Sequence, residues 1–425
     1  MNLKKIATLC SLLSLSLTGT LSSAVADDLL IRNATVYTAE GVKTDTDLLV
    51  KRGVIEAIGK NLSAATETPE YDAKGQSVTP GLFNADTHLG VEEVSAVDQT
   101  VDYFSENERI TASMKVADGF NTDSMVIPHN RLHGLTHALV VPDSDAGLFA
   151  GQAALIRLNA NGEKIINDSV AVVVSLGEHG QHLAGGSRAV AMAMLREALN
   201  DAKDYAANRA AVNSGSRRDY HLSLGDLNSL VPVVQGKKHM IVEVNRADDI
   251  LRVIQLAKAY KLKVILSGVA EGWRVADDIA SASIPVILDP INNLPLAYEQ
   301  LGARLDNAAL MERAGVTMMF TGMGWQNTHN AYLVRQSAGN AVANGLSKTA
   351  AINAMTVNPA KVFSLSKTGR LAVGQKASLV VWSGDPLEVT SVARMVLIDG
   401  ESQPLMSRSL RLRDRYYDRL RASME

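Results

Sequence analysis

Acidic and histidine side chains stand at the ends of several apolar runs, where their chemistry could serve a site. Asp86 and His88 end one such run, Glu178 follows a second and Glu243 lies within a third. Carboxylate oxygens favour hard divalent ions such as magnesium, calcium or manganese, whereas imidazole nitrogens also suit zinc. Both groups can transfer protons as general acids or bases. Side chains of these types could bind a divalent ion, or they could hydrogen-bond to one another and to water.

The elements that would position these residues alternate between apolar strands and helices from residue 81 to residue 365. The sequence predicts strands over residues 138–141, 170–174, 240–244, 264–266, 286–288 and 318–320. Ala-rich helices are predicted over residues 189–206 and 248–260. Strands that alternate with helices over this length favour a parallel barrel or a doubly wound sheet.

Both ends of the chain have a different texture, with short alternating runs and turn residues typical of β hairpins. These runs occupy residues 29–37, 47–50, 54–59, 377–382 and 393–400. We therefore expect residues 27–80 and 366–405 to pair into one small β-sandwich domain. The tail over residues 406–425, rich in Arg and Leu, predicts a surface helix.

The first 26 residues have the pattern of a secretory signal peptide. Lys4 and Lys5 precede an apolar run that is too short to cross a bilayer, and Ala24-Val25-Ala26 supplies small residues for cleavage. We therefore expect a periplasmic or otherwise secreted protein with no membrane span. Cys10, the only cysteine, lies inside this segment, so the mature chain relies on a large apolar core in place of disulfides.

The charge balance gives no sign of a nucleic-acid partner. Removal of Lys4 and Lys5 leaves 40 of the 42 basic residues against 45 acids, a net charge near −5. Binding to nucleic acid or to an anionic membrane surface usually needs a basic excess. We expect neither partner.

One long motif and several shorter ones share their order with a known family. The run 75–90 contains Pro80-Gly81-Leu82-Phe83-Asn84 just before Asp86 and His88. Further matching pieces lie at residues 134–136, 151–152, 245–250, 354–361, 369–371, 374–377 and 382–386. In this order they resemble the amidohydrolase superfamily, in particular its imidazolonepropionase-related branch. The resemblance implies an α/β fold, a (β/α)8 TIM barrel over residues 81–365 with a composite β-sandwich from both chain ends.

The resemblance also implies a metal site at the barrel mouth, but several of its residues are replaced here. In the family, histidines and carboxylates on neighbouring strand ends hold one or two divalent ions, and an aspartate after the eighth strand transfers a proton to the leaving nitrogen. Carried over, the family's positions fall on Asp86, the retained His88, Glu178, Glu243, Gly268 and, for the proton carrier, Gly322.

Two changes are to acids and two remove the side chain. Asp86, His88, Glu178 and Glu243 are the metal ligands that the resemblance leaves, and their oxygens suit one divalent ion harder than zinc. The loss of the proton carrier at Gly322 removes general acid–base assistance, typically worth ~10²–10⁴ in rate. No catalytic residue is assigned.

Simpler readings of these polar residues stay open. The four candidate ligands could be remnants that hydrogen-bond to one another or to water, since structural networks also gather charges in clefts. His179 and His182 could reach the same mouth if their loop folds inward, although loop histidines are more often solvated.

Other candidates have ordinary explanations as well. Residues on the loop after the first barrel strand could contact a substrate or simply be exposed; they are Glu92, Glu93, Asn107 and Glu108. His137 is expected to be a packed or hydrogen-bonded core residue. His329 is expected to begin a helix near the eighth strand.

Three functions remain open at this point. The first is a catalytically silent homologue that acts as a subunit or binding protein beside an intact amidohydrolase, or as a homo-oligomer. The second is a hydrolase of amide, cyclic amide or peptide bonds with a remodelled metal site. The third is a solute-binding or scaffold role unrelated to hydrolysis. A small amide or peptide is the ligand that the resemblance implies.

Overall fold

The computed structural model describes residues 28–424, apart from residues 323, 325 and 326. The predicted signal peptide, residues 1–26, lies outside these residues. Within them, no helix combines the length and the apolar character that crossing a membrane requires.

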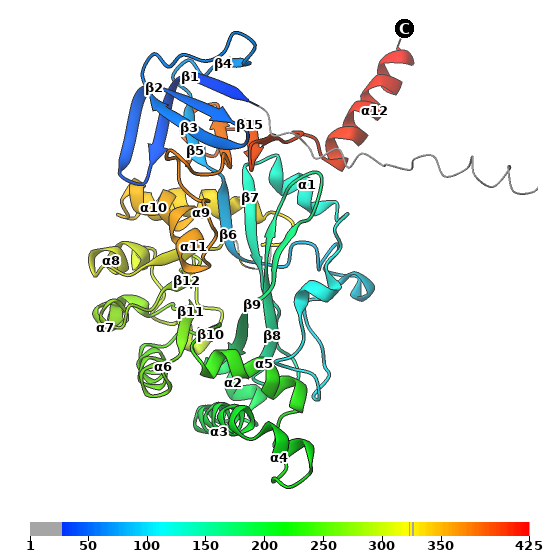
Figure 1. Ribbon diagram of the computed structural model, residues 1–425, viewed down its shortest axis with the longest axis vertical. Coiled ribbons are helices and arrows are strands. Elements are labelled where there is room, and N and C mark those ends of the chain that lie inside the picture. Colours follow the sequence, from blue (N-terminus) through cyan, green and yellow to red (C-terminus); the bar gives the residue numbers. More distant parts are fainter. Residues whose placement is uncertain (1–27, 323, 325–326, 425) are drawn as a thin grey trace, which may run out of the picture.

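Both ends of the chain contribute strands to one eight-stranded sheet (Figure 1). Its N-terminal strands are β1 (Leu29–Thr38), β2 (Gly41–Lys51), β3 (Val54–Gly59), β4 (Glu70–Asp72) and β5 (Ser77–Pro80). Its C-terminal strands are β14 (Leu379–Trp382), β15 (Ala393–Ile398) and β16 (Glu401–Ser402). The two groups meet where β5 pairs antiparallel with β14, while β5 pairs parallel with β1. The two-layer sandwich, and domain limits at residues 80 and 366, stay predictions.

A second eight-stranded sheet forms a nearly closed barrel in the order β13-β12-β11-β10-β9-β8-β7-β6. Its strands are β6 (Leu82–Thr87), β7 (Leu135–Val140), β8 (Phe149–Arg157), β9 (Ile165–Ser175), β10 (His239–Val244), β11 (Lys263–Gly268), β12 (Val286–Leu288) and β13 (Met318–Phe320). Between the two end strands, the Thr321 hydroxyl after β13 donates to the Asp86 carbonyl of β6 at 2.9 Å. This bond links the two edges of the barrel.

One strand departs from the predicted (β/α)8 pattern. β8 runs antiparallel to both β7 and β9, and no helix separates these three strands. Asn161-Gly162 lies in the connection from β8 to β9, and such a pair between strands is a strong hairpin signal. The sheet is therefore a barrel of mixed parallel and antiparallel strands. The strict alternation of strands and helices expected from the sequence is wrong for this segment.

Helices cover the outer face of the barrel, as Figure 1 shows for α6, α7 and α8 beside β10, β11 and β12. The α-helices are α1 (Val126–Arg131), α2 (Gly177–Leu183), α3 (Arg188–Ala207), α4 (Arg209–Asn213), α5 (Leu224–Val234), α6 (Ala247–Tyr260), α7 (Ala276–Ser281), α8 (Asn307–Arg313), α9 (Val334–Ala343), α10 (Lys348–Ala354), α11 (Val357–Val362) and α12 (Arg408–Ala422). The 3₁₀ helices are η2 (Asp98–Thr100), η3 (Val116–Gly119), η4 (Gly272–Val275), η5 (Tyr298–Gln300) and η7 (Ala331–Leu333). The helices predicted over residues 189–206 and 248–260 correspond to α3 and α6.

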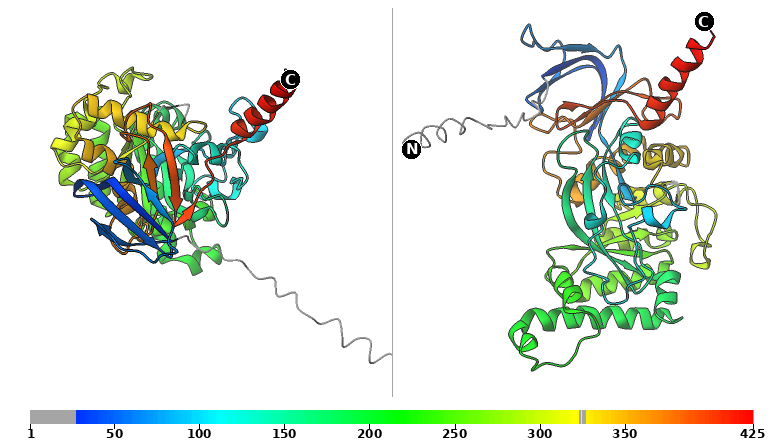
Figure 2. Two further views of the ribbon diagram at one scale, coloured as in Figure 1. Left: turned by 90° about the horizontal axis from the view of Figure 1, so that it is seen from above. Right: turned by 90° about the vertical axis from the view of Figure 1, so that its right-hand side faces the viewer.

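The barrel interior is apolar at its centre and polar at one end. Ile241 and Val173 belong to a buried cluster within the barrel. Since side chains alternate along a strand, Glu243 and Ser175, each two residues further on, face the same interior. The carboxyl ends of β9 and β10 therefore carry polar groups at a mouth, which lies near α2 and α3 and away from the first sheet (Figures 1 and 2).

A close contact joins the first sheet to the barrel. Trp382 of β14 is fully buried, and its indole N–H donates to the Thr79 hydroxyl at 2.9 Å. Gly134, before β7, has a φ of +92°, and a Cβ there would lie 2.4 Å from the Trp382 ring. Only glycine fits both the left-handed backbone and the space under this ring.

Replacement of Gly134 by alanine should therefore destabilise the protein. Gly374→Ala is a matched control, because Gly374 also has a positive φ, +83°, but an added Cβ would meet nothing within 4 Å. We expect Gly374→Ala to cost ~1 kcal/mol of unfolding free energy from backbone strain alone. Gly134→Ala should cost a further ~1–3 kcal/mol from overpacking against Trp382. Urea denaturation measures both, and equal losses would show that the ring does not restrict this site.

Candidate functional site

The predicted site positions fall on the carboxyl side of the barrel sheet. Counted from β6, Asp86 lies on the first strand, Glu243 on the fifth and Gly268 on the sixth. Glu178 follows the fourth strand and Gly322 follows the eighth. Because the carboxyl ends of parallel strands meet at one end of a barrel, these positions border one mouth.

His88 is held between two carboxylates. Its Nδ1 lies 3.6 Å from an oxygen of Glu92 and its Nε2 lies 3.7 Å from an oxygen of Asp143. The ring also stacks on Tyr103, with 3.7 Å between centroids. Burial disfavours the charged ring, but the bond to Glu92 and the charges of Asp143 and Asp86 raise the pKa of His88. This favours an imidazolium, whose two N–H groups leave no lone pair for a metal ion.

Glu92, the carboxylate beside His88 Nδ1, is held in place by the protein. Its carboxylate is buried and accepts a hydrogen bond from the Thr328 hydroxyl at 2.6 Å. Burial alone would raise the pKa of Glu92, but hydrogen bonds from His88, Ser95 and Thr328 lower it to about 2. Glu92 therefore stays ionised and orients His88, a role that its loop position in the sequence did not reveal.

Asp86 and Glu243 are two acids at the mouth, and among the described residues neither has an ion-paired cation of its own. Burial and, to a smaller extent, the negative charges of Asp143 and Glu243 raise the pKa of Asp86, whereas the positive charge of His88 lowers it. The result is a pKa of about 7. Glu243 keeps contact with water, yet the protein around it, together with Asp143, also raises its pKa. The Ser175 hydroxyl donates to Glu243 at 3.2 Å. Asp86 is therefore half protonated near neutral pH and can both donate and accept hydrogen bonds.

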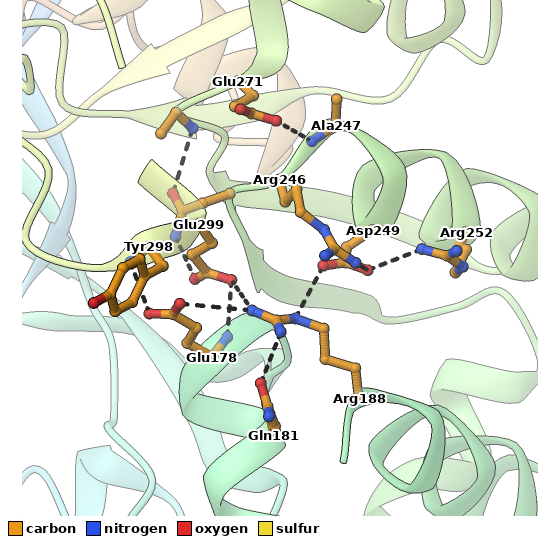
Figure 3. A network of polar contacts seen from close by, with 12 residues as sticks. Glu178, Gln181, Arg188, Arg246, Ala247, Asp249, Arg252, Glu271, Tyr298 and Glu299 are labelled. Carbon is orange, nitrogen blue, oxygen red and sulfur yellow. Dashed lines mark hydrogen bonds and ion pairs between the residues drawn. The ribbon is translucent and has the colours of Figure 1, made fainter. Parts of the chain in front are cut away.

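Glu178 belongs to a separate network (Figure 3). Its carboxylate accepts a hydrogen bond from the Tyr298 N–H at 3.1 Å and lies 3.8 Å from the Arg188 guanidinium. Its own N–H donates to Glu299 at 2.8 Å. The structure thus gives Glu178 a cation, Arg188, and two hydrogen-bond partners, the Tyr298 N–H and the Glu299 carboxylate. Asp86, His88 and Glu243 belong to a different set of interactions.

The two glycines that replace family ligands are closely packed. Gly268 has a φ of +89°, and a Cβ there would lie 2.6 Å from the Asn245 side-chain oxygen. Asn245 is held by Glu299, which accepts from it at 3.0 Å, and by the Ala270 N–H at 3.3 Å. At Gly322 a Cβ would lie 2.3 Å from the Ser337 hydroxyl. Any side chain at either position would have to displace its neighbour.

These residues do not fit the family's metal centre. Among the residues that the structure describes, no three His, Cys, Asp or Glu side chains are arranged to hold a metal ion. The donors that remain at the mouth are the two carboxyls of Asp86 and Glu243, while His88 is paired through both nitrogens. The four-residue ligand set and the choice of metal stay predictions.

The other histidines singled out in the sequence have local partners or lie on the surface. His137 is buried and bonds to the Thr136 hydroxyl at 2.9 Å, as expected of a core residue. The ring of His179 bonds to the Ser144 carbonyl at 2.7 Å, and His182 is exposed. His329 lies just before η7, and its ring bonds to the Glu93 carbonyl at 2.8 Å.

Polar residues of the loop after β6 form hydrogen bonds mostly with other residues of the same loop. Glu93 accepts a hydrogen bond from Asn121 at 3.1 Å, and Asn107 accepts from the Arg109 N–H at 2.9 Å. Glu108 is exposed at the edge of a separate cavity. Sequence reasoning missed Asp143, which follows β7 and faces His88. Its place directly after an apolar strand is a signal that could have indicated it.

The sequence matches the model described as "Amidohydrolase family" over residues 168–402, more than half of its 425 residues. An amidohydrolase of Hapsidospora irregularis is 22% identical over 424 residues, covering 88% of this chain and 43% of that protein. The chain thus spans less than half the length of the curated relatives it matches.

Solved structures share the fold. The crystal structure of an amidohydrolase from Thermotoga maritima MSB8 has a TM-score of 0.78 at 24% identity, covering 89% of this chain and 100% of that chain. A mutant of atrazine chlorohydrolase from Arthrobacter aurescens TC1, in complex with zinc and atraton, has a TM-score of 0.52 at 15% identity and covers 91% of this chain and 98% of that chain. At these identities the likeness concerns the architecture alone.

Proposed function

This chain belongs to the amidohydrolase family, and we propose that it is an exported member that has lost metal-dependent hydrolysis. Its role in this proposal is that of a binding protein or of a subunit beside an active relative. Its place in the imidazolonepropionase-related branch, which the order of its motifs predicts, is part of the same proposal. The alternative, a hydrolase with a remodelled Asp/His/Glu metal site, is less favoured.

The observation that carries this proposal is the filled space at Gly268 and Gly322. Asn245 and Ser337 lie where a ligand and a proton carrier would begin, at 2.6 and 2.3 Å from the Cβ positions. A simple loss of side chains would leave room that a single reversion could fill. Packing against both glycines instead indicates that the neighbouring residues have adapted to the loss.

The remaining groups suit binding better than hydrolysis. Asp86, with a pKa of about 7, can donate to a carbonyl oxygen when protonated, and Glu243 can accept from an amide N–H. The carboxylates around His88 raise its pKa and so favour its charged form. A small amide or peptide offers matching groups. None of these three residues stands at the position from which the family protonates a leaving nitrogen.

An unpartnered helix supports the subunit role. α12 projects from the body in Figures 1 and 2, and none of its residues is buried. Leu412, Tyr416 and Leu420 recur at every fourth residue and so lie on one face; Tyr416 and Leu420 are 59% and 60% exposed. In the Hapsidospora irregularis relative, the region similar to this chain belongs to a protein more than twice as long. Both facts fit a chain that works beside another domain or subunit.

Removal of residues 407–425 tests this role. We expect the mature protein to form a stable complex with itself or with a metal-binding amidohydrolase from the same organism, measured by mass photometry and by affinity purification. Loss of the helix should weaken this complex at least tenfold, because its apolar face would supply the contact. The triple variant Leu412→Ser, Tyr416→Ser, Leu420→Ser retains the helix's charges and should act alike.

Two results would contradict the subunit role. One is a protein that stays monomeric at all concentrations and captures no amidohydrolase. The other is a complex of equal strength with and without α12. If the subunit role fails in this way, calorimetry tests the other role. Binding of a small amide at the mouth would then support the proposal that the chain is a binding protein.

A further inference from the structure

A pocket beside the barrel mouth is lined by four arginines. It has a volume of about 390 Å³ and lies between the start of α2, the first turns of α3 and the start of α6. Its charged lining residues are Arg188, Arg196, Arg246, Arg252 and Asp249. Figure 3 shows Arg188, Arg246 and Arg252 arranged around Asp249. The function proposed above makes no use of this pocket.

The single acid of this lining is shared by three guanidinium groups. Asp249 lies 3.3 Å from Arg188, 2.9 Å from Arg246 and 3.1 Å from Arg252. One carboxylate cannot neutralise three cations, and Arg196 adds a fourth. Among the described residues Arg196 has no hydrogen-bond or ion-pair partner. The lining therefore has an excess of positive charge.

Acids on the opposite side of Arg188 reduce this excess without removing it. Glu178 and Glu299 lie 3.8 and 3.6 Å from the same end of its guanidinium, while its Nε faces Asp249. Gln181 also accepts from Arg188 at 2.7 Å. These contacts fix Arg188 at the pocket edge. They do not reach Arg196 or Arg252, whose charges remain open to the pocket.

Several polar atoms in this network lack hydrogen bonds. The Nε atoms of Arg188 and Arg246 are buried and have no acceptor in hydrogen-bonding geometry. Arg188 Nε faces Asp249 Oδ2 at 3.3 Å, and this oxygen also lacks a hydrogen bond, so Arg246 Nε is the donor left without a facing acceptor. Buried N–H groups in proteins nearly always have acceptors. The first turn of α3, a helix of 20 residues, also lines the pocket, and its end carries a partial positive charge. The positive charge of the lining, the Arg246 donor without an acceptor and the direction of α3 all favour an anion in this pocket.

We propose that this pocket binds a small oxyanion, a carboxylate or phosphate group of a ligand. Guanidinium groups match the two-oxygen edge of either group and bind it with charge-assisted hydrogen bonds. Arg196, Arg246 and Arg252, which all line the pocket, supply the guanidinium groups for the anion. This site does not depend on whether the barrel mouth is catalytic, since none of the pocket's lining residues is a candidate metal ligand or proton carrier.

Calorimetry on the full mature protein tests the site with two probes, inorganic phosphate and succinate. We expect saturable binding of at least one probe, and the preferred probe identifies phosphate or carboxylate as the natural group. Arg196→Gln should weaken binding about tenfold, the usual effect of one charge-assisted hydrogen bond. Raising the ionic strength from about 0.05 to 0.5 M should weaken it as well, since the pocket is open to water.

Arg394→Gln is the matched control. Arg394 is an exposed arginine of β15 without a protein partner among the described residues, so its replacement removes the same charge from a different surface. It should leave the affinity for either probe within twofold of the unaltered protein. Because Arg196 is exposed and unpaired, its replacement should not alter the thermal unfolding of the free protein. The proposal is overturned if neither probe binds, or if Arg196→Gln and Arg394→Gln bind equally.

Discussion

Zinc-loaded mature protein should hydrolyse dipeptides, cyclic amides and N-acyl amino acids far more slowly than about 1 s⁻¹, the low end of ordinary enzyme rates. Gly322 offers no acid to protonate a leaving nitrogen, and loss of such a group alone costs ~10²–10⁴ in rate. A zinc ion bound by several carboxylates would also keep little positive charge to acidify its water. Both effects act in the same direction.

The packing at Gly322 also predicts that restoring an acid there does not restore hydrolysis. If the acid were merely absent, Gly322→Asp should raise the rate. Because the Ser337 hydroxyl occupies the space of the first side-chain atom, we expect Gly322→Asp to fold less stably and to gain no activity. The double variant Gly322→Asp, Ser337→Gly removes this clash and should recover stability. Its activity should still be absent, since Gly268 leaves the metal site incomplete.

Rates and metal content measured on the same samples decide the matter. Turnover at about 1 s⁻¹ or more by zinc-reconstituted protein, lost in His88→Ala, would overturn the silent-site interpretation. The control for folding is His137→Ala at a buried site outside the mouth, where any loss would reflect stability alone. If the protein binds one zinc ion per chain but shows no turnover, the proposed loss of catalysis holds and the proposed loss of the metal site is wrong.

The parts of the fold that the sequence predicts are those set by local pattern. α3 and α6 begin and end within two residues of the predicted helices, because their apolar spacing and flanking residues are local. β8 was missed because its run 149–157 is apolar throughout and contains Gly151, so neither alternation nor length identifies it as a strand. The antiparallel direction of β8 is set by its pairing with β9 across the turn at Asn161-Gly162.

The strand positions of three candidate residues were predictable, but their interactions were not, and whether these residues form one site stays a prediction. Asp86, Glu243 and Gly268 could be assigned to strand ends, since each belongs to a β-strand of the barrel sheet. That Glu178 meets Arg188 depends on how α3 packs beside α2, which no spacing encodes. Likewise, Asn245 and Ser337 fill the space at the two glycines only after strands and helices distant in sequence have packed.

Deprotonation of Asp86 should make the protein less stable as the pH rises from about 4 to about 8. Asp86 has a pKa of about 7 in the folded chain against 3.8 as its ordinary value. The folded state therefore binds more protons than the unfolded state between these values, and unfolding free energy falls as the pH rises through them. At 1.36 kcal/mol per pKa unit the loss has an upper limit of ~4 kcal/mol, and contact with water at the mouth reduces it to ~2 kcal/mol.

Asp86→Asn isolates this contribution from those of its neighbours. His88, with a raised pKa, also loses stability as the pH rises through its folded value, whereas Glu92 matters only below its ordinary pKa of 4.5. Asparagine cannot ionise, so the variant should equal the unaltered protein near pH 4.5 and exceed it by ~2 kcal/mol at pH 8. Urea unfolding at both pH values measures the difference, with exposed Asp219→Asn as the control. If the difference between the two proteins does not change with pH, Asp86 titrates in the folded chain as it does in the unfolded one. Asp86 would then be an ionised carboxylate at neutral pH, stabilised by the charge of its neighbour His88.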